Sequence, residues 1–572
     1  MEISYMMKTL LIYPYFIEQR VHDEDVGTIP MGLYYIGAML RENGYPVEIL
    51  NFCHYTKSSP EIPEILKREN PDIIGFSIVN GNRWGAIETA AIAGQLNPSV
   101  KIVFGGAGAT FLWQHLMTHF PAIDYVVIGE GEYTFLHLLS CIRDQKPDHI
   151  PRIPGLVFRD GDTVRFTGRA PFIQDLDALP LPAKYFAYQH LSLSRGCPGN
   201  CSFCGSPGIW ERKVRFHSAA YFVDQIELLV QKGITFFYVS DDTFTLDKKR
   251  VMEICRLILE RNLVISWAAI SHVHYVDAEM LYWMRLAGCS RISYGVESGS
   301  EKIRNRLNKN IRTAQIEKAF HETLSFGILA RAYIIYGCPG ETWETIQETI
   351  DLMNRIKPLS VIFYILALFP GTALYSEFQK KFHVHDDIWL NYQEDILYFE
   401  NDPQLTRDLI LAFGQKLRTE FHAGLHRYAE ALELVDRKEL YEKHADFYSR
   451  LGMTFSHGDY SRIEAVADKQ DIAEKMFKRA LRYAPNHHAH LGLGIVQQQK
   501  HEILQSIKTL EEGLVRYPGS EPLCTCLGIS YMNDGQYEKA LSLFLKFPES
   551  EQAKQCASEC FQALGKPNPA GE

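Results

Sequence analysis

Three cysteines within eight residues are the most chemically suggestive feature of the sequence. Cys197, Cys201 and Cys204 lie in "SRGCPGNCSFCGS" (194–206), at spacings of four and three residues. Four thiolates close a structural zinc or iron–sulfur site, whereas three leave one metal position open to another ligand. The spacing therefore predicts a catalytic metal cluster. The alternatives are a zinc site completed by a distant histidine or cysteine, and three thiols that bind nothing.

The residues between the cysteines also favour a cluster. Gly196, Pro198 and Gly199 make the loop compact, and glycine lets the backbone approach the sulfurs closely. Hydrogen bonds from backbone amides to sulfur help to set the reduction potential of a cluster. The other nine cysteines indicate small buried residues, because they lie in apolar or helical surroundings or lack further ligands nearby.

Composition and charge exclude several classes of protein. Of the 572 residues, 46% are hydrophobic and 22% charged, as in globular proteins, and the length suggests three or four domains. The net charge of −10, with no basic stripe, argues against nucleic-acid binding. The N-terminus lacks a signal-peptide pattern, and the longest apolar run, 361–370, is too short to span a bilayer. We therefore expect a cytoplasmic protein whose cysteines stay reduced.

The elements that must position the cysteines alternate between strand and helix. Between 191 and 400, strands are expected at 191–195, 234–242, 264–270, 291–297, 329–337 and 360–369, with helical segments between them. Six such units predict a partial (β/α)6 barrel whose chemistry lies at the carboxyl ends of the strands. The three cysteines follow the first strand and therefore belong to that end of the barrel.

Residues 1–145 show a similar alternation, which predicts a separate Rossmann-like domain of α/β class. Its strands are expected at 8–15, 46–52, 72–79, 101–106 and 125–131. Near-continuous apolar strands between helices are typical of a parallel sheet covered on both faces. Such sheets bind ligands at the carboxyl ends of their strands, where "FGGAGAT" and "VIGEGEYTF" supply several glycines.

The remaining segments differ in composition from these two α/β regions. We expect a proline-punctuated linker (146–190), a helical connector (401–444), an all-α repeat array (445–560) and a tail (561–572). Within the array, "LG" recurs at a step of 34 residues, at 493–494 and 527–528. This period is typical of tetratricopeptide repeats, which are helix pairs that bury their faces by stacking on one another.

The cysteine motif resembles the signature of the radical S-adenosylmethionine (SAM) superfamily. Cys197-x3-Cys201-x-Phe203-Cys204 follows the first expected barrel strand, and an aromatic residue before the last cysteine belongs to that signature. The resemblance implies that the three cysteines hold a [4Fe-4S] cluster and that the amino and carboxylate groups of SAM bind its fourth iron. Reduction then yields methionine and a 5′-deoxyadenosyl radical, which abstracts a hydrogen atom from the substrate.

Two further segments resemble SAM-contacting loops of the same family. In "VSDDTFT", Asp241 and Asp242 match a segment that contacts the methionine part of SAM, although a role in forming the turn fits them equally well. In "YGVESGSE", Glu297 matches a SAM-binding position, where a carboxylate accepts hydrogen bonds from both ribose hydroxyls. The alternative for Glu297 is capping of the helix that follows it.

A third segment, "YGCPGET", resembles a family loop that lines the adenosine and substrate side. It contains Gly337 and follows the fifth expected strand. The turn, rather than the thiol, is the recurring feature of this loop. We therefore interpret Cys338 as structural.

The N-terminal domain resembles the cobalamin-binding domain that precedes such barrels. The resemblance implies that Gly105, Gly106 and Gly108 let a corrin and its nucleotide tail approach the strand ends, and that Gly129 and Gly131 belong to the same site. One feature departs from the family pattern. The Asp-x-His-x-x-Gly motif that supplies a lower axial histidine is absent, because "HDEDVG" does not match it and "GGAGAT" has no histidine. We expect cobalamin without a histidine lower ligand; the alternative is a vestigial domain.

Together these resemblances imply a cobalamin-dependent radical SAM enzyme. The commonest activity of such proteins is methylation of an unactivated carbon or of phosphorus, in which one SAM methylates the cobalamin and a second generates the radical. The alternative reaction is radical oxidation or ring closure, as in anaerobic cyclisation of a chlorophyll precursor. A non-catalytic cobalamin- or peptide-binding scaffold is the alternative of another class.

The resemblance also implies partners. These are a small-molecule, lipid or peptide substrate and an external electron donor such as flavodoxin or ferredoxin. The helical array is expected to dock a partner protein, or else to cap the barrel. If it docks a partner, truncation near 440 is expected to leave a folded core that holds its cluster.

Overall fold

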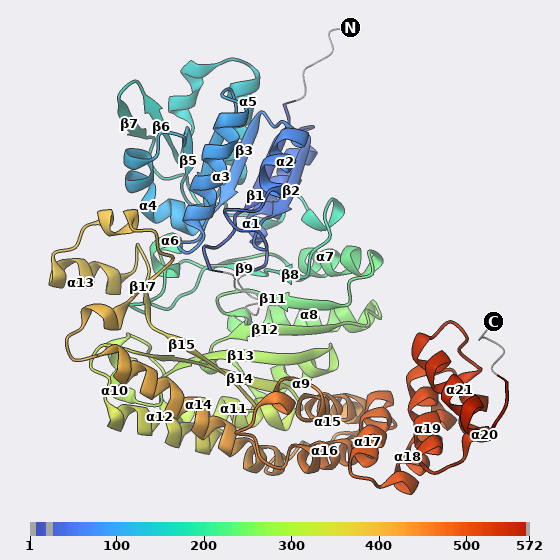
Figure 1. The fold of residues 1–572 in the computed structure, drawn as a ribbon. Helices are drawn as coiled ribbons and strands as arrows, with labels where there is room; N and C mark the ends of the chain where they lie inside the picture. The colour runs from blue at the N-terminus through green and yellow to red at the C-terminus, as the bar shows by residue number, and fades with distance from the viewer. Residues whose placement is uncertain (1–6, 19–26, 568–572) are drawn as a thin grey trace.

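The protein is described from a computed structural model that covers residues 7–18 and 27–567. Most of "HDEDVG" (22–27), which bears on the missing histidine motif, lies outside the described residues. Figure 1 shows an N-terminal α/β domain, a second α/β domain next to it, and a helical region that curves away from the second domain. The expected fold class is confirmed at this level.

The N-terminal domain is built on a sheet that, within the described residues, has seven strands in the order β2-β1-β3-β4-β5-β6-β7. Its parallel strands are β1 (Thr9–Tyr13), β2 (Val47–Asn51), β3 (Ile73–Ser77), β4 (Lys101–Gly105) and β5 (Tyr125–Val127). They alternate with α1 (Met31–Glu42), α2 (Glu61–Glu69), α3 (Arg83–Leu96), α4 (Gly106–His119) and α5 (Glu132–Arg143). In β1, Leu10 and Ile12 pack into one apolar cluster and Leu11 into another, so both faces of the sheet are buried.

The sheet extends beyond residue 145, into the range that composition indicates as a linker. β6 (Leu156–Asp160) pairs antiparallel with β5, and β7 (Thr163–Phe166) pairs with β6. The prolines lie outside these two strands, which are short enough to fit between Pro154 and Pro171. The rest of 146–190 carries 3-10 turns and runs to the second domain.

The second domain has the expected partial barrel. Its described strands form a six-stranded parallel sheet in the order β15-β14-β13-β12-β11-β8. They are β8 (His190–Leu191), β11 (Phe236–Val239), β12 (Ser266–Ser271), β13 (Cys289–Glu297), β14 (Leu329–Tyr336) and β15 (Ser360–Ile365). The helices are α7 (Ala219–Gln231), α8 (Lys248–Glu260), α9 (Ala278–Leu286), α10 (Glu301–Arg306), α11 (Thr313–Ser325) and α12 (Trp343–Ile356).

The first barrel strand is shorter than the sequence pattern indicates. Only β8 pairs with the barrel, while β9 (Ser194–Arg195) turns away and pairs antiparallel with β10 (Arg215–Phe216). The carboxylate of Asp241 explains the break, because it accepts hydrogen bonds from the amides of Leu193 and Ser194 at 2.9 and 2.6 Å. These two amides are thereby satisfied outside the parallel ladder. After β9 the chain forms the cysteine loop and then α6 (Ser206–Trp210).

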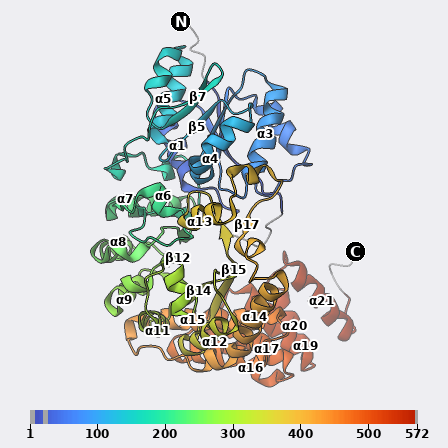
Figure 2. The ribbon, with the colours of Figure 1, turned by 90° about the vertical axis from the view of Figure 1, so that its left-hand side faces the viewer.

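The chain then returns to the N-terminal domain between β15 and the C-terminal helices. It forms β16 (Ala367–Leu368), α13 (Ala373–Phe382), the 3-10 helix η6 (Asp386–Leu390) and β17 (Ile396–Leu397). We call residues 383–402 the returning segment (Figure 2). The buried Arg83 of α3 holds this segment by donating to the carbonyls of Gln393 and Glu394 at 2.7 and 2.9 Å.

Successive helices make up the C-terminal region. They are α14 (Arg407–Glu430), α15 (Tyr441–Ser456), α16 (Lys469–Tyr483), α17 (His487–Gln499), α18 (Ile503–Arg516), α19 (Glu521–Asn533), α20 (Tyr537–Phe544) and α21 (Glu551–Ala563). The glycines of the two "LG" pairs stand where neighbouring helices touch: a Cβ on Gly494 would meet Leu510 at 2.6 Å, and one on Gly528 would meet Phe544 at 2.5 Å. Their assignment as tetratricopeptide repeats stays a prediction.

The first helices of this region belong to the barrel core. The buried Arg285 of α9 donates to the carbonyl of Lys443, and Tyr460 donates to the carbonyl of Leu359 at 2.6 Å. The apolar cluster that fills the barrel continues through α15 and α16 as far as Val496 of α17, whereas α18–α21 share a separate cluster. No helix in the described part of the chain is long and apolar enough to cross a membrane.

Candidate active site between the two α/β domains

The cysteine loop is held open by a glycine and shaped by its own amides. Gly196 follows β9 with φ +107°, and a Cβ there would meet the carbonyl oxygen of Lys213 at 2.1 Å, so another residue would displace the loop. The amide of Gly199 donates to the Sγ of Cys197 at 3.4 Å. The sequence therefore places one amide against sulfur before any cluster is bound, as expected from the glycines of the loop.

All three cysteines line a cavity of about 940 Å³ at the mouth of the barrel. The volume lies near the upper end of the range for ligand pockets. Several residues from the carboxyl ends of the strands line it as well: Asp242, Thr243, His272, Gly295, Glu297, Lys309 and Tyr333. The cavity has room for a cluster together with a second ligand of the size of SAM.

The spacing of the sulfurs fits a cluster better than a single ion. Two thiolates on one zinc ion stand no more than about 4.6 Å apart, because each Zn–S bond is about 2.3 Å. Among the described residues, one group of three histidine, cysteine or carboxylate ligand atoms lies within 4.8 Å of one another, and that group does not include these sulfurs. The three sulfurs are thus too far apart for one zinc ion. Together with the open cavity beside them, they fit a [4Fe-4S] cluster.

Burial favours the neutral form of two of the thiols, those of Cys201 and Cys204, in the cluster-free protein. It raises the pKa of Cys201, with the nearby Lys309 ammonium acting in the opposite direction, and it raises the pKa of Cys204 to about 11. Thiolates, not thiols, bind metal, so loading of a cluster must release protons from this loop.

The two aspartates of the "VSDDTFT" segment have different positions. Asp241 is buried behind the cavity wall and its carboxylate binds the backbone of β9, so it fixes the strand that leads into the cysteine loop. Burial raises the pKa of Asp241 to about 7. Asp242 lines the cavity, accepts a hydrogen bond from Ser206 at 2.6 Å, and has its pKa raised by burial. Of the two, Asp242 is placed to contact a ligand.

Glu297 ends β13 in a strained conformation. Its φ is +65°, which a residue with a side chain adopts rarely, and the strand register shifts between Gly295 and Glu297. Its carboxylate is buried and accepts a hydrogen bond from Lys309 Nζ at 2.9 Å. The alternative role for Glu297 is to cap α10, but its carboxylate binds this lysine and not an amide of that helix. Lys309 was not expected from the sequence, because it lies beyond the motif on a loop.

His272, at the end of β12, completes this side of the cavity and was also missed. Burial, together with the charge of Lys309, lowers the pKa of His272 to about 4, so its ring is neutral at physiological pH. The Nδ1 of this neutral ring accepts a hydrogen bond from the amide of His274 at 3.2 Å, so its Nε2–H is left as a hydrogen-bond donor next to the cationic Lys309.

Gly337 stands behind the wall and does not line either cavity described here. It has φ +79°, and its amide donates to the carboxylate of Glu341, which also accepts from the amide of Cys338 at 3.2 Å. Burial raises the pKa of Glu341 to about 7. The loop after β14 is therefore built around a buried carboxyl group, and Cys338 is a buried neighbour of it.

A second cavity, of about 270 Å³, lies at the carboxyl ends of the N-terminal strands. Gly105, Gly106, Gly129 and Gly131 line it, and Asp242 belongs to its wall as well as to that of the barrel cavity. The two cavities thus adjoin at Asp242. This is the place where a Rossmann-like sheet and a barrel are both expected to bind ligands.

The glycines serve different purposes. A Cβ on Gly106 would meet the carbonyl of Ile78 at 2.7 Å, and one on Gly108 would meet Val79 at 2.8 Å, so both are needed where α4 packs against the end of β3. Gly108 does not line the cavity. Gly129 has open space around the position of a Cβ, which leaves room for a ligand.

The lining of this cavity fits one part of a cobalamin. It is mostly apolar, and among the described residues no histidine lines it. That cobalamin binds without a histidine lower ligand stays a prediction. The volume of the cavity lies at the low end of the range for drug-sized ligands, so it accommodates one arm of so large a cofactor. When bound, cobalamin would be held by the glycine-rich strand ends of the N-terminal domain.

A buried ionic cluster joins the two domains beside this cavity. Arg195 of β9 contacts Glu130 and Glu132 at 2.6 Å each, and Arg215 of β10 contacts Glu130 at 2.7 Å. Burial opposes the charge of Arg195, but the two carboxylates outweigh it and raise the pKa of its guanidinium. The "GEGE" segment thus fixes the strand that precedes Cys197. This pairing joins residues more than 60 positions apart, and no local pattern indicates it.

Comparison with known proteins agrees with this architecture. Residues 191–353 match the radical SAM superfamily and residues 26–139 match the B12 binding domain. An uncharacterized methyltransferase of Pyrococcus horikoshii, PH0819, is 33% identical over 384 residues, which cover 65% of this chain and 83% of that protein. The chain belongs to the radical SAM superfamily. It is a member with an N-terminal B12-binding domain.

Two further proteins resemble the chain. The anaerobic magnesium-protoporphyrin IX monomethyl ester cyclase of Cereibacter sphaeroides is 28% identical over 387 residues, which cover 64% of this chain and 63% of that protein. The structure of the cobalamin-dependent SAM radical enzyme OxsB with aqua-cobalamin matches with a TM-score of 0.59 and 16% identity, over 98% of this chain and 84% of that one. At this identity the second match describes the fold alone.

Proposed function

We propose that this protein is a cobalamin-dependent radical SAM methyltransferase. The observation that carries the proposal is the shared wall at Asp242, which separates the cysteine-lined cavity of the barrel from the glycine-lined cavity of the B12-binding domain. When bound, the cluster supplies the electron that cleaves SAM, and cobalamin supplies the chemistry of methyl transfer. Adjoining sites suit a reaction in which both cofactors act on one substrate.

In this proposal the residues of the chain bind and orient SAM. Cys197, Cys201 and Cys204 hold the cluster and leave one iron for SAM. Glu297 accepts hydrogen bonds from the ribose and is kept in place by Lys309. Asp242 contacts SAM, whereas Asp241 and Glu341 support the backbone that carries these groups.

Of the two curated relatives described above, the protein from Pyrococcus horikoshii is the more similar, and it is named a methyltransferase. This similarity favours methylation of a carbon or phosphorus atom over ring closure. The substrate class is a metabolite, lipid or peptide. The second candidate is oxidative ring closure without methyl transfer, which the similarity to the anaerobic cyclase favours.

Three further features belong to the proposal. An external donor such as flavodoxin or ferredoxin would reduce the cluster, because reductive cleavage of SAM consumes an electron that must be supplied to the cluster. The cluster thiols need a reducing compartment, which favours a cytoplasmic location.

The C-terminal helices, of which α18–α21 form an apolar cluster of their own, would dock a protein partner.

Isotope labelling tests the reaction. Anaerobically reconstituted protein with cobalamin, a reductant and SAM carrying a trideuterated methyl group is incubated with cell extract, and the products are analysed by mass spectrometry. Methylation predicts a product that gains the labelled methyl group and that is missing with Cys201→Ala. Formation of 5′-deoxyadenosine together with a product that has lost hydrogen and gained no label would support ring closure instead.

A further inference from the structure

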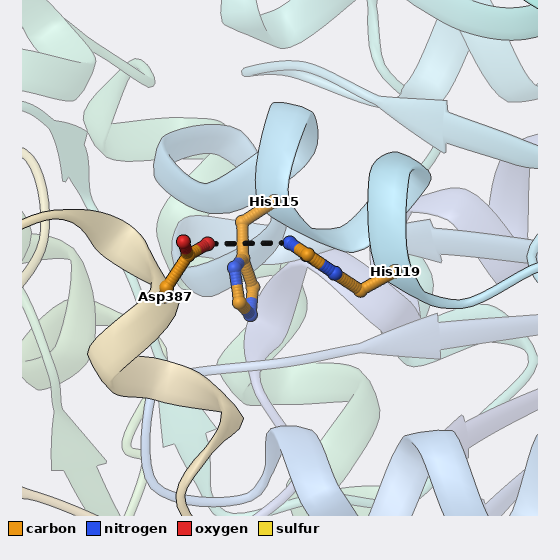
Figure 3. Close-up of side chains that lie close together, drawn as sticks. All are labelled: His115, His119 and Asp387. Atoms are coloured by element: carbon orange, nitrogen blue, oxygen red, sulfur yellow. Dashed lines mark ion pairs between the residues drawn. The ribbon is translucent and has the colours of Figure 1, made fainter.

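Two histidines and an aspartate meet outside the cavity that the three cysteines line. His115 and His119 stand one turn apart on α4, and Asp387 belongs to η6 of the returning segment (Figure 3). Each offers one ligand atom, and these atoms lie within 4.8 Å of one another. His119 Nε2 is 3.3 Å from Asp387 Oδ1. From these contacts we propose that His115, His119 and Asp387 bind a divalent transition-metal ion, and that zinc is the ion they suit.

The state of His115 points independently to a ligand. Its side chain is 5% exposed, yet neither ring nitrogen has a hydrogen-bond partner among the described residues. Buried polar groups in folded proteins nearly always have partners, and an unsatisfied nitrogen costs about 1–3 kcal/mol. Burial and the neighbouring His119 both lower the pKa of His115, so its ring is neutral and can donate a lone pair to a metal.

The geometry is close to that of a bound ion. Ligands at about 2.0–2.2 Å from one zinc ion stand no more than about 4.3 Å apart, so small rotations of side chains from the observed positions suffice. Two imidazoles and one carboxylate form a donor set that zinc accepts and that calcium and magnesium do not favour. His119 and Asp387 have side chains that are 32% and 74% exposed, which gives an ion a path from solvent and leaves room for a water molecule as fourth ligand.

The aspartate is held by its own neighbours. Asp386, next to it, accepts hydrogen bonds from Tyr375 and Gln379 at 2.9 Å each, and Trp389 donates to Tyr375 at 2.8 Å. This network fixes η6 against α13, and so holds the backbone of Asp387, as a second shell fixes metal ligands. An ion here would link the returning segment to the helix that begins at Gly106, in addition to the contacts of Arg83 with the same segment. The inference is independent of the reaction proposed above.

The cysteine loop must be kept out of the test, because free thiolates also bind zinc. The holoprotein, with its iron–sulfur cluster reconstituted, is treated with a chelator, desalted and titrated with Zn²⁺ by calorimetry and with Co²⁺ by absorption. We expect one equivalent of metal, and cobalt bands of a nitrogen and oxygen site without thiolate-to-metal charge transfer. Uptake of metal by cluster-free protein only would overturn the proposal.

Two exposed ligands give variants that should fold. His119→Gln and Asp387→Asn are each expected to lower the affinity for Zn²⁺ by more than about 100-fold, since even loss of an outer-shell partner costs about 10- to 100-fold. Zn²⁺ is also expected to raise the melting temperature of the wild type and not of the variants. His137→Gln, at an exposed position on α5, is the matched control and should bind as the wild type does. Equal affinities in all four proteins would contradict the site.

Discussion

At the scale of single residues, Glu297 combines two features that cost free energy, a left-handed backbone and a buried carboxylate. A left-handed backbone at a residue other than glycine costs about 1–3 kcal/mol, and here it coincides with a buried carboxylate. Strain of this kind persists where the surrounding structure imposes it, most often at functional sites. Lys309 balances the charge but contacts only one of the carboxylate oxygens, Oε1.

Glu297→Gln is therefore expected to weaken SAM binding and to leave the cluster in place. Loss of one charged hydrogen-bond acceptor suggests a penalty of about 1.5–3 kcal/mol, or roughly 10- to 100-fold in the dissociation constant. Equilibrium binding of SAM and the iron content of the reconstituted protein measure the two effects. Glu253→Gln, on the exposed side of α8, is the control. Unchanged affinity in Glu297→Gln would leave this carboxylate without a role in binding.

Glu341 gives a residue-scale prediction about pH. Its pKa is raised to about 7 by burial, so between the ordinary value of 4.5 and pH 7 the carboxyl group ionises in the unfolded chain and stays protonated in the folded one. Folding therefore loses stability as the pH rises through this window, by up to about 3 kcal/mol. Glu341→Gln keeps an oxygen that accepts from Gly337 and Cys338 and does not ionise.

The difference in melting temperature between Glu341→Gln and the wild type measures this effect. The variant is expected to gain stability relative to the wild type from pH 5 to pH 8. Glu344→Gln, three residues further on and exposed, should show no such trend. A constant difference across this range would mean that Glu341 titrates at its ordinary pKa.

At the scale of elements, the ionic cluster between β9 and the "GEGE" segment fixes the strand that leads into the cysteine loop, and so fixes the position of that loop. Arg195→Met leaves Glu130 and Glu132 buried without this partner, and breaking a buried pair in this way costs about 3–5 kcal/mol. We expect a lower melting temperature and a lower iron content after reconstitution. The matched control is Arg165→Met, which removes an exposed ion pair with Asp160 and should cost at most about 1 kcal/mol. Equal iron content in both variants would argue against the coupling.

The same elements show how far a sequence can be interpreted. Both sheets and the place of the cysteine loop follow from local patterns, because apolar runs and a short motif lie within a few residues. The break between β8 and β9 does not follow, since it depends on Asp241 reaching back across nearly 50 positions to two amides. Arg195 and the metal ligand Asp387 were missed for the same reason, because each meets its partner only after segments distant in sequence have packed. Lys309 lies only 12 positions after Glu297, but on a loop beyond the motif.

At the scale of the whole molecule, the C-terminal helices are not a single unit. α15 and α16 share the core of the barrel, while α18–α21 pack mainly on one another. Arg285 and Tyr460 bind backbone carbonyls across this boundary, and Gly327 lies against His444 of α15. The repeat pattern alone predicts that a cut near 440 leaves a folded core. The contacts described here show instead that such a cut would remove one wall of the barrel core. The first part of the region covers the barrel core, whereas the second part forms an apolar cluster of its own.

Two truncations separate these roles. A chain that ends at residue 500 is expected to stay soluble, hold its cluster and cleave SAM to 5′-deoxyadenosine, because its barrel core through Val496 is intact. A chain that ends at 440 is expected to aggregate or to lose its cluster, since the apolar residues that α15 covers become exposed and Arg285 loses the Lys443 carbonyl. Solubility, iron content and 5′-deoxyadenosine formation measure the outcome. Equal behaviour of the two truncated chains would show that α15–α17 contribute nothing to the barrel. Loss of cluster from the chain that ends at 500 would extend the cap to α18–α21 and leave no separate part of the chain to dock a partner.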